Sequence, residues 1–176
     1  YRRLLTERID ISQEYEGSGF TLTGDRAKMK IALRNLLTNA IESIHGRGEI
    51  RTRVEGRPDE LSLTIVDTGE GMDAATMQRI FEPFFTTKEA GKGTGLGLAT
   101  VYGIAKQHHG WVEVESEVGK GSVFRVYLPS SAQAGSSRTS TPGFEGKRGT
   151  ETILLVEDEK NVRDTTAQCL REFGYR

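Results

Sequence analysis

The sequence lacks the features that mark several classes of protein. It has a single cysteine, Cys169, so an internal disulfide is impossible. It has no run of about 18 apolar residues, so we expect no membrane-spanning segment. Its formal net charge is −1, without a basic block or an acidic tail, so nothing points to nucleic acid or to direct contact with a membrane. Together these absences favour a cytoplasmic protein.

The ends of the sequence also lack the marks of a complete chain. It begins with Tyr1 instead of Met, and the opening YRRLLTERIDIS has no long apolar core of a signal peptide. It stops at Arg176, directly after a predicted helix. We therefore expect a piece of a longer protein, with room for one domain and a fragment of a second.

Apolar periodicity predicts a mixed domain over residues 1–129. Strands are expected at residues 9–11, 20–22, 50–55, 61–67, 111–116 and 122–128, and helices at 25–44, 74–81 and 96–108. Asp25 is the expected N-cap of the first helix, and Gly46 its stop signal. The apolar stripe of this helix comprises Met29, Leu33, Leu36, Leu37, Ala40, Ile41 and Ile44. The predicted fold class is α/β (α+β), a two-layer sandwich of a mixed, largely antiparallel sheet with helices on one face.

The composition changes after this domain. Residues 130–150 are rich in Ser, Gly and Thr and predict a flexible linker. Residues 153–156 form an unbroken apolar run, which predicts a strand buried on both faces. An acidic pair follows, and then a helix whose expected inward residues are Val162, Thr166, Cys169, Leu170 and Phe173. Residues 151–176 are thus predicted to open a second unit.

Two asparagines lie four residues apart on the first long helix. Asn35 and Asn39 share one face with Lys28 and Glu42. Asparagine is disfavoured in helix interiors because its side-chain amide competes with the backbone for hydrogen bonds. Two asparagines on one face therefore call for an explanation. One interpretation is a solvated polar face. The other is a metal–phosphate site, because an amide oxygen can ligate Mg²⁺ together with phosphate oxygens.

The 21 glycines gather in a few segments. Asp67 ends an apolar strand, and its carboxylate can accept a hydrogen bond from an exocyclic amine. Gly69 and Gly71 follow it and can let the backbone run close beneath a planar base. An Asp-Gly turn after a strand is also common. Residues 91–98, GKGTGLGL, lead into a helix whose N–H groups and dipole favour phosphate. They lack the Gly-Lys-Ser/Thr of a P-loop and the βαβ setting of a dinucleotide fingerprint.

The order and spacing of these motifs resemble the catalytic ATP-binding domain of sensor histidine kinases. NLLTNA at residues 35–40 is similar to the N box of that family, DTGEGM at 67–72 to its first glycine box, IFEPFFTTK at 80–88 to its phenylalanine box, and GTGLGL at 93–98 to its second glycine box. EVGKGSVFRVYLP at 117–129 resembles the closing strand pair. The resemblance covers residues 4–129 and implies the α/β sandwich shared with gyrase-type ATPases and Hsp90-type chaperones.

The resemblance also implies cofactors and site residues. The cofactors are ATP and Mg²⁺; Asn39 would ligate the metal and Asp67 would bind the adenine amine. The implied ATP-binding residues are Asn35, Asn39, Asp67, Gly69, Gly71, Met72, Lys88, Lys92, Gly93, Thr94, Gly95, Leu96, Gly97 and Ser122. Asn35 and Lys88 are the implied catalytic residues.

A lid over the nucleotide is implied as well. Residues 72–94 would form it, with Phe81, Phe84 and Phe85 as anchors or as core residues. Glu42 departs from many of these kinases, which have Lys at this position. Two roles stay open for Glu42: a position behind the metal, or an ion pair with Lys or Arg.

Asn35 distinguishes between relatives within the superfamily. In the gyrase-type ATPases and chaperones a Glu four residues before the metal Asn activates water, whereas Asn35 cannot act as a general base. This favours phosphoryl transfer to a protein over hydrolysis, with catalysis by positioning and charge neutralisation. The alternatives are an ATP-driven conformational machine and a degenerate module that binds ATP without transfer.

The implied enzyme is a protein-histidine kinase in a two-component system. It would transfer the γ-phosphoryl group of ATP to a histidine on a dimerisation hairpin that precedes this chain, for relay to a receiver aspartate. His45, His108 and His109 have no acid beside them in the acceptor pattern and are expected to have loop or helix-end roles. We therefore expect the chain to be inactive alone.

The tail carries a resemblance of its own. TILLVEDE at residues 152–159 is similar to the first strand of receiver domains, so Glu157 and Asp158 would belong to an incomplete acidic Mg²⁺ pocket. This implies a hybrid kinase with a truncated receiver at 151–176. The implied partners are the phosphoacceptor hairpin of the same protein and a receiver domain in cis or a response regulator in trans.

Overall fold

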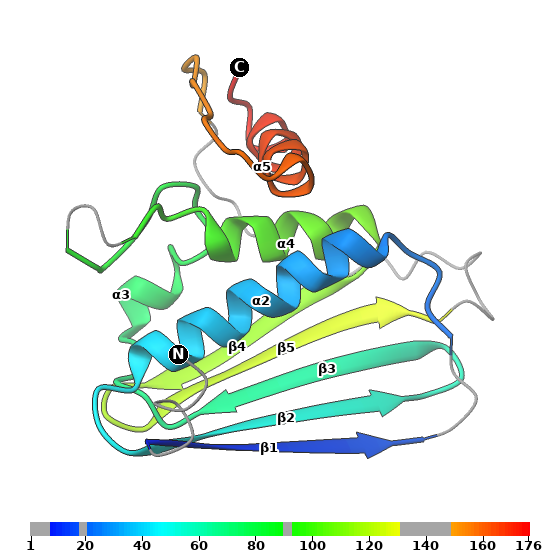
Figure 1. The fold of residues 1–176 in the computed structure, drawn as a ribbon, viewed down its shortest axis with the longest axis vertical. Helices are drawn as coiled ribbons and strands as arrows, with labels where there is room; N and C mark the ends of the chain where they lie inside the picture. The colour runs from blue at the N-terminus through cyan, green and yellow to red at the C-terminus, as the bar shows by residue number, and fades with distance from the viewer. Residues whose placement is uncertain (1–7, 18–20, 90–92, 131–148) are drawn as a thin grey trace.

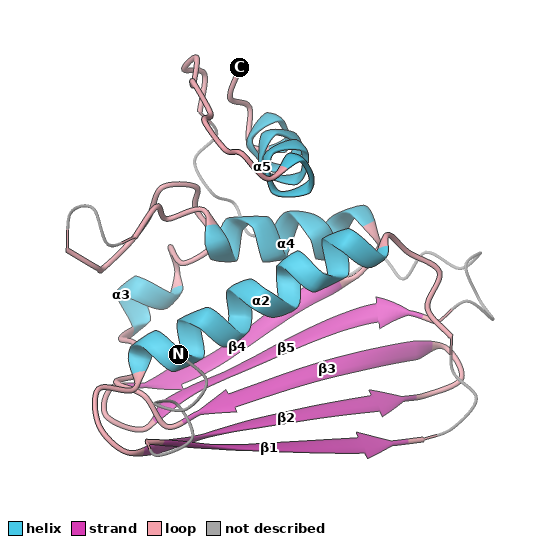
Figure 2. Ribbon diagram, viewed as in Figure 1, coloured by secondary structure: helices cyan, strands magenta, loops and turns pink. Residues whose placement is uncertain are grey.

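The computed structural model describes residues 8–17, 21–89, 93–130 and 149–176 (Figure 1). The strands are β1 Ile9–Glu16, β2 Gly48–Gly56, β3 Glu60–Asp67, β4 Trp111–Glu117 and β5 Gly121–Pro129, and the helices are α2 Arg26–Ser43, α3 Ala74–Met77, α4 Gly97–Gln107 and α5 Lys160–Glu172. α2 and α4 cover one face of the sheet (Figure 2). This confirms the predicted fold class. α5 lies on the side of α4 away from the sheet and adds a partial third layer.

The sheet is mixed, with the strand order β1-β2-β3-β5-β4. β1 pairs with β2 in parallel, so the chain crosses over through α2, and all other pairs are antiparallel. β3 is the central strand. Its last residue, Asp67, pairs with Ile50 of β2 and with Ser122 of β5. Asp67 is therefore enclosed on both sides at one end of the sheet.

Local signals set the start of α2, as predicted. Asp25 Oδ1 accepts hydrogen bonds from the N–H groups of Ala27 at 2.8 Å and Lys28 at 3.2 Å, and these bonds lower the Asp25 pKa. Before it, residues 21 and 22 form no strand, and residue 20 lies outside the described part of the chain.

The end of α2 lies close to the prediction, whereas part of its apolar stripe differs. The helix ends at Ser43, one residue before the predicted end at about Ile44, because Ile44 becomes extended and buries its side chain to 2% exposure. Leu33 is 38% exposed and was wrongly assigned to the stripe. The residues of α2 that are buried are Ile31, Ala32, Leu36 and Ala40.

The core lies between the two covering helices and the sheet. Its fully buried large side chains are Leu36, Ile50, Ile65, Val101 and Ile104. Each such side chain contributes about 1.5–3 kcal/mol by burial. This core fixes α2 against β3 and α4 against β4 and β5, and it holds the two helices side by side.

The tail departs most from its prediction. Residues 153–156 form no strand, and Leu154 and Val156 are 89% and 84% exposed. The backbone bonds that join this segment to the chain end are Ile153 N to Arg176 O and Arg176 N to Glu151 O. The predicted buried strand is wrong because the segment lies with α5, on the side of α4 away from the sheet, where no strand of the described residues is beside it (Figure 1).

The α5 helix, in contrast, buries the face predicted for it. Cys169 is 3% exposed, its Sγ lies 3.0 Å from the Ala99 carbonyl oxygen, and a Cβ on Gly103 would lie 2.9 Å from that Sγ. Burial raises the pKa of the Cys169 thiol to about 12. Phe173 packs near Tyr102 with ring centroids 6.1 Å apart. Among the described residues, no helix is both long and apolar enough to cross a membrane.

Candidate functional site

One face of α2 connects all the predicted nucleotide motifs. Asn35, Asn39, Glu42 and Ser43 recur at helical spacing along this face. From Asn35 to Ser43 the helix rises about 12 Å. Along that length the face contacts the start of α4, then Lys88 at the end of the phenylalanine box, and then the end of β3.

Asn35 joins α2 to the start of α4. Its Nδ2 donates a hydrogen bond to the Gly97 carbonyl oxygen at 3.2 Å. Gly97 lies close to Asn35, because a Cβ on it would be 3.8 Å from Asn35 Cγ. Asn35 therefore fixes the glycine-rich segment to α2 through a neutral donor.

Asn39 and Glu42 both contact Lys88. The Lys88 ammonium donates to Asn39 Oδ1 at 3.3 Å and forms an ion pair with Glu42. The pair is partly exposed, at 37% for the Lys88 side chain and 45% for that of Glu42. Of the two roles left open for Glu42, the structure shows the pair with a lysine.

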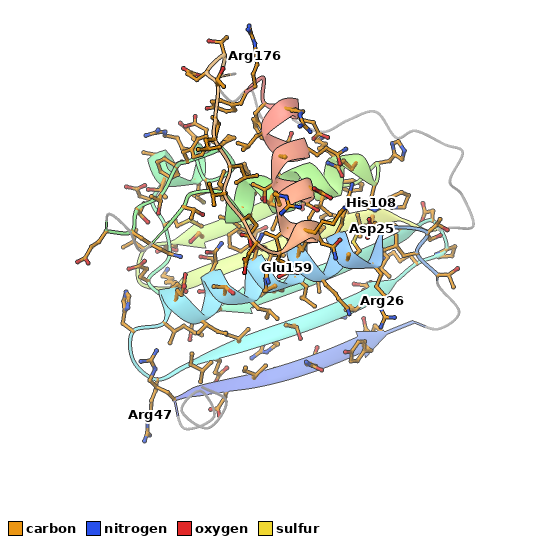
Figure 3. The ribbon with its side chains drawn as sticks, turned by 45° about the horizontal axis from the view of Figure 1, so that its top comes forward. Asp25, Arg26, Arg47, His108, Glu159 and Arg176 are labelled. Carbon is orange, nitrogen blue, oxygen red and sulfur yellow. The ribbon has the colours of Figure 1, made fainter. Side chains whose placement is uncertain are left out.

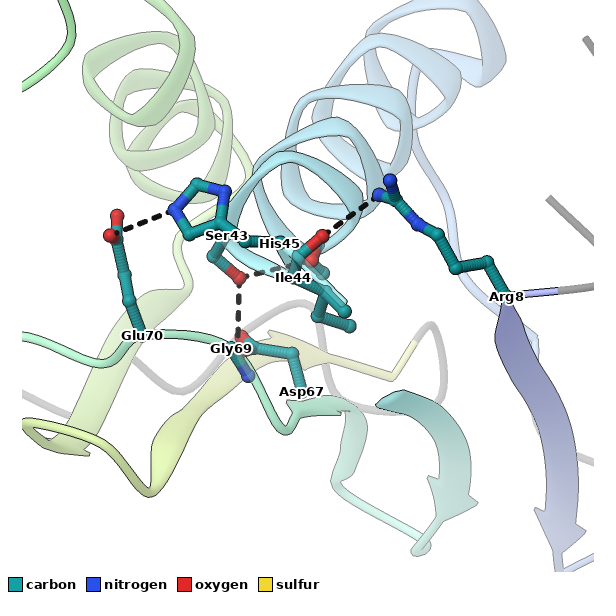
Figure 4. Close-up of polar contacts among 8 residues, drawn as sticks. Arg8, Ser43, Ile44, His45, Asp67, Gly69 and Glu70 are labelled. Carbon is teal, nitrogen blue, oxygen red and sulfur yellow. Dashed lines mark hydrogen bonds and ion pairs between the residues drawn. The ribbon is translucent and has the colours of Figure 1, made fainter. Parts of the chain in front are cut away.

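The carboxylate of Asp67 lies where α2 ends, as Figure 4 shows. Its Oδ1 accepts a hydrogen bond from the Gly69 N–H at 2.8 Å. The Ser43 Oγ lies 3.3 Å from the same oxygen and 3.0 Å from the Ala40 carbonyl, and its single proton serves one acceptor at a time. Asp67 is 4% exposed. It is thus a buried and oriented hydrogen-bond acceptor.

Burial raises the pKa of the Asp67 carboxyl group above its ordinary value. Hydrogen bonds from Gly69, Ser43 and the Ser122 backbone lower the pKa in part. The net effect is a carboxylate whose charge is destabilised in the free protein, so a donor that bonds to it restores part of the lost solvation.

The glycines after Asp67 are required by contacts within the protein. A Cβ on Gly69 would lie 2.0 Å from Ser43 Oγ. Gly71 has φ +67°, and a Cβ there would lie 2.0 Å from the Glu117 carbonyl oxygen. The β4–β5 turn also contacts this segment, because the Gly119 N–H donates a hydrogen bond to the Glu70 carbonyl oxygen at 2.7 Å. The first glycine box is therefore held between α2 and this turn.

Met72 and Ser122 belong to a small polar network beside the first glycine box. The Met72 N–H donates to Ser116 Oγ at 2.8 Å, and Ser116 Oγ lies 3.0 Å from Ser122 Oγ. This network ties the start of the predicted lid to the β4–β5 hairpin. It was missed from the sequence because Ser116 carries no motif.

The second glycine box crosses the phenylalanine box at close range. Gly95 has φ +66°, and a Cβ on it would lie 2.3 Å from the Phe84 carbonyl carbon. A Cβ on Gly93 would lie 2.6 Å from Thr86 Oγ1 and 3.2 Å from Lys88 Cδ. Gly95 thus allows the two boxes to pack backbone against backbone, and Gly93 allows the side chains of Thr86 and Lys88 to pack against the second box.

The first turn of α4 follows the segment that is predicted to receive phosphate. Leu96 is its N-cap residue, and no side chain caps the helix there. Thr94 Oγ1 lies 3.4 Å from the Leu96 N–H, a long hydrogen bond. The leading N–H groups and the helix dipole are thus oriented toward the glycine-rich segment. Lys92 lies outside the described residues.

The three phenylalanines of the box have different environments. Phe81 is 6% exposed and its ring centroid lies 5.5 Å from that of Tyr102, so it is a core residue, one of the two roles expected for it. Phe85 packs beneath the Arg79 guanidinium, 4.4 Å from its ring centroid. Phe84 is 42% exposed, so it does not anchor the segment in the core as predicted, and its ring meets the edge of Tyr175.

The histidines lie at helix ends and loops. His45 Nε2 is 3.1 Å from Glu70 Oε2 at the surface (Figure 4). His108 Nε2 accepts from the Asp25 N–H at 3.1 Å, and its Nδ1 lies 2.8 Å from the Ile104 carbonyl (Figure 3). His109 follows α4 with φ 58°. The expected loop and helix-end positions are confirmed.

The acidic pair in the tail forms no metal centre within the described part of the chain. There, no group of three or more His, Cys, Asp or Glu side chains is placed to hold a metal ion. Glu157 Oε1 and Asp158 Oδ1 both accept from the Glu159 N–H, at 3.1 and 3.0 Å. Their assignment to a receiver pocket stays a prediction.

A comparison with known families decides the identity of this domain. Residues 24–132 match the family described as "Histidine kinase-, DNA gyrase B-, and HSP90-like ATPase". The chain belongs to this ATPase family. The match includes α2, the glycine boxes and the β4–β5 hairpin, so this ATPase domain accounts for every element of the candidate site.

Relatives of this ATPase domain are sensor kinases. "Sensor kinase CckA" of Brucella abortus (strain 2308) is 34% identical over 196 aligned residues, which cover 98% of this chain and 21% of that protein. "Sensor histidine kinase ZraS" of Klebsiella oxytoca is 41% identical over 113 residues, covering 64% of this chain and 24% of that protein. The chain thus spans about a fifth to a quarter of these relatives.

Solved structures agree with this fold. The catalytic domain of the histidine kinase ThkA is 30% identical with a TM-score of 0.64, covering 73% of this chain and 84% of that one. Full-length ShkA in complex with AMPPNP is 27% identical with a TM-score of 0.63, covering 99% of this chain and 36% of that one. ThkA in complex with the response regulator TrrA is 26% identical with a TM-score of 0.62, covering 76% and 38%.

Proposed function

We propose that this chain is the ATP-binding catalytic module of a two-component sensor histidine kinase. The observation that carries the proposal is the single face of α2 that meets, in order, the phosphate-cradle end of α4, the Lys88 segment and the buried carboxylate of Asp67. That order matches a nucleotide with its base at one end and its phosphates at the other. The kinase names of the relatives support it.

In this proposal the base lies beside Asp67 and the phosphates lie near residues 93–97. The buried Asp67 carboxylate accepts a hydrogen bond from the adenine amine. The N–H groups that begin α4 receive the phosphates, while Lys88 turns toward them from its place beside α2. Met72 and Ser122 fix the hairpin and the start of the lid on the side of the base.

The residues around Asn39 fit Mg²⁺. Asn39 Oδ1 already has a cation as partner, the Lys88 ammonium, and Glu42 places a carboxylate beside it. Oxygen ligands of this kind suit Mg²⁺, which would neutralise phosphate charge when bound with ATP. Asn39 is the residue that would hold the ion.

Asn35 supports transfer in preference to hydrolysis. Its amide donates to Gly97 and provides no group that removes a proton from water.

The proposed acceptor is a histidine on a dimerisation hairpin of the parent protein. The proposed onward partner is a receiver domain in cis or a response regulator in trans, and the complex of ThkA with TrrA supports the latter. Because ATP is the donor, we place this module in the cytoplasm.

We propose further that residues 130–150 are a linker and that residues 151–176 open a receiver domain of a hybrid kinase. The alignment with CckA covers 98% of the chain and therefore reaches into this tail. Glu157 and Asp158 would contribute to the acidic pocket of the complete receiver.

The test uses radiolabelled ATP. The chain alone should take up negligible label, and a separate hairpin carrying the acceptor histidine should become labelled when the chain is added. The transfer should be slower than in a kinase in which the two are tethered, because the hairpin is found by diffusion. Asn39→Ala should abolish the transfer, while Thr38→Ala, on the exposed side of α2, should retain it. Strong label on the chain alone, at any of its three histidines, contradicts the proposal.

A further inference from the structure

The Lys88 ammonium lies at a point where three elements meet. Asn39 and Glu42 contact it from α2, and its aliphatic stem runs from the phenylalanine box. Gly93, at the start of the second glycine box, packs against that stem, since a Cβ there would lie 3.2 Å from Lys88 Cδ and 3.3 Å from Lys88 Cβ. Lys88 is thus positioned by packing as well as by charge.

The same ammonium uses the oxygen atom that the proposed function gives to the metal. Asn39 Oδ1 accepts from Lys88 Nζ at 3.3 Å. Mg²⁺ requires ligands at about 2.0–2.1 Å in octahedral geometry. An ammonium and a divalent cation this close together repel each other. Asn39 therefore cannot serve both cations at once.

We propose that Lys88 is a tethered cation that occupies the metal position of the free protein, and that Glu42 is the positioning residue that holds it there. This inference rests on the proposed function. Binding of the metal–nucleotide complex displaces the ammonium from Asn39, and the flexible stem lets it turn toward the phosphates. Glu42 is the anion to which Lys88 returns when the nucleotide leaves.

The ion pair between Lys88 and Glu42 therefore weakens nucleotide binding, because the free energy that stabilises the pair has to be overcome when the ammonium is displaced. Because both side chains are partly exposed, the pair is weak, and its removal should strengthen binding of ADP·Mg²⁺ by about 2- to 5-fold. If Glu42 were instead a metal ligand, its loss would weaken binding of ADP·Mg²⁺. The sign of the effect thus separates the two roles.

The experiment is a double-mutant cycle on the full chain, read by calorimetry with ADP and Mg²⁺. Glu42→Gln removes the charge with little change of shape, and Lys88→Gln removes the competing cation. We expect Glu42→Gln to tighten binding in the wild-type background and to have no effect in the Lys88→Gln background. Glu55→Gln is the matched control, because it breaks the Arg57–Glu55 ion pair at the end of β2 opposite to Asp67 and should leave the affinity unchanged.

A second readout needs no nucleotide. Acylation of Lys88, followed by mass spectrometry, should be faster in Glu42→Gln than in the wild type, and unchanged in Glu55→Gln. A Glu42→Gln variant that weakens ADP·Mg²⁺ binding, or that acts equally in both backgrounds, overturns the inference and leaves the proposed function standing. A wild-type chain that binds no ADP·Mg²⁺ overturns the proposed function itself, and the displacement of Lys88 with it.

Discussion

The Phe84 N–H donates a hydrogen bond to the Gly95 carbonyl oxygen, 3.0 Å away, and both residues have left-handed backbones, with φ of 69° and 66°. A left-handed φ is costly for a bulky residue such as Phe84, by about 1–2 kcal/mol. The contact joins the phenylalanine box to the second glycine box. It thus holds together the two ends of the loop that includes residues 86–89.

Gly95→Ala should open this loop. The new Cβ would lie 2.3 Å from the Phe84 carbonyl carbon, and the backbone would keep φ +66° only at a cost. We expect a loss of at least about 2 kcal/mol in the free energy of unfolding, together with weaker ADP binding. Urea denaturation measures the first and calorimetry the second.

Gly46→Ala is the matched control for that substitution. A Cβ on Gly46 has no neighbour within 4 Å. The same chemical change there should leave stability and ADP binding nearly unaltered. Equal effects at the two positions would show that the contact between Phe84 and Gly95 has no special role.

Asp67→Asn should weaken nucleotide binding. The carboxylate is a charged acceptor, and such a hydrogen bond contributes about 1.5–3 kcal/mol. We therefore expect ADP affinity to fall about 10- to 100-fold in calorimetry. An unchanged affinity would show that the base is recognised elsewhere.

The same variant should change how stability depends on pH. The raised pKa of Asp67 means that the folded protein binds this proton more tightly than the unfolded chain does. The contribution of Asp67 to the free energy of unfolding is therefore full below its ordinary pKa of 3.8 and is lost as the pH rises through the raised pKa.

Asp67→Asn removes that titration. The difference in free energy of unfolding, variant minus wild type, should thus increase with pH across this window. Urea denaturation from about pH 4 to about pH 8, without nucleotide, measures it. A difference that stays flat or decreases with pH would mean that burial does not dominate the pKa of Asp67.

Gly103→Ala should loosen α5 from α4. The new methyl group would lie 2.9 Å from Cys169 Sγ, while alanine itself favours the helix by about 1 kcal/mol. In the wild type, burial and a pKa of about 12 should make Cys169 almost unreactive toward a thiol reagent at neutral pH. We expect labelling at least about tenfold faster in Gly103→Ala without loss of domain stability. The remote Gly46→Ala should label at the wild-type rate, and equally slow labelling in Gly103→Ala would contradict this packing.

The sequence by itself determined the elements that depend on local signals. Asp25 capped α2 as expected, because capping involves only the next few residues. The hairpins of the sheet followed from alternating apolar residues and glycine turns. The buried face of α5 around Cys169 followed from helical periodicity. The order and spacing of the motifs were sufficient to predict the family, because they can be read directly from the sequence.

Only the tertiary structure decided the contacts between distant residues. Lys88 meets Asn39 and Glu42 across 49 and 46 residues, and no pattern in the sequence announces that pairing. It also decided that residues 153–156 form no strand, since a strand requires a partner beside it and apolar composition alone provides none. The contacts of Glu42 and of the glycines were decided in the same way, because a charge pair and a close approach both depend on which segments the core brings together.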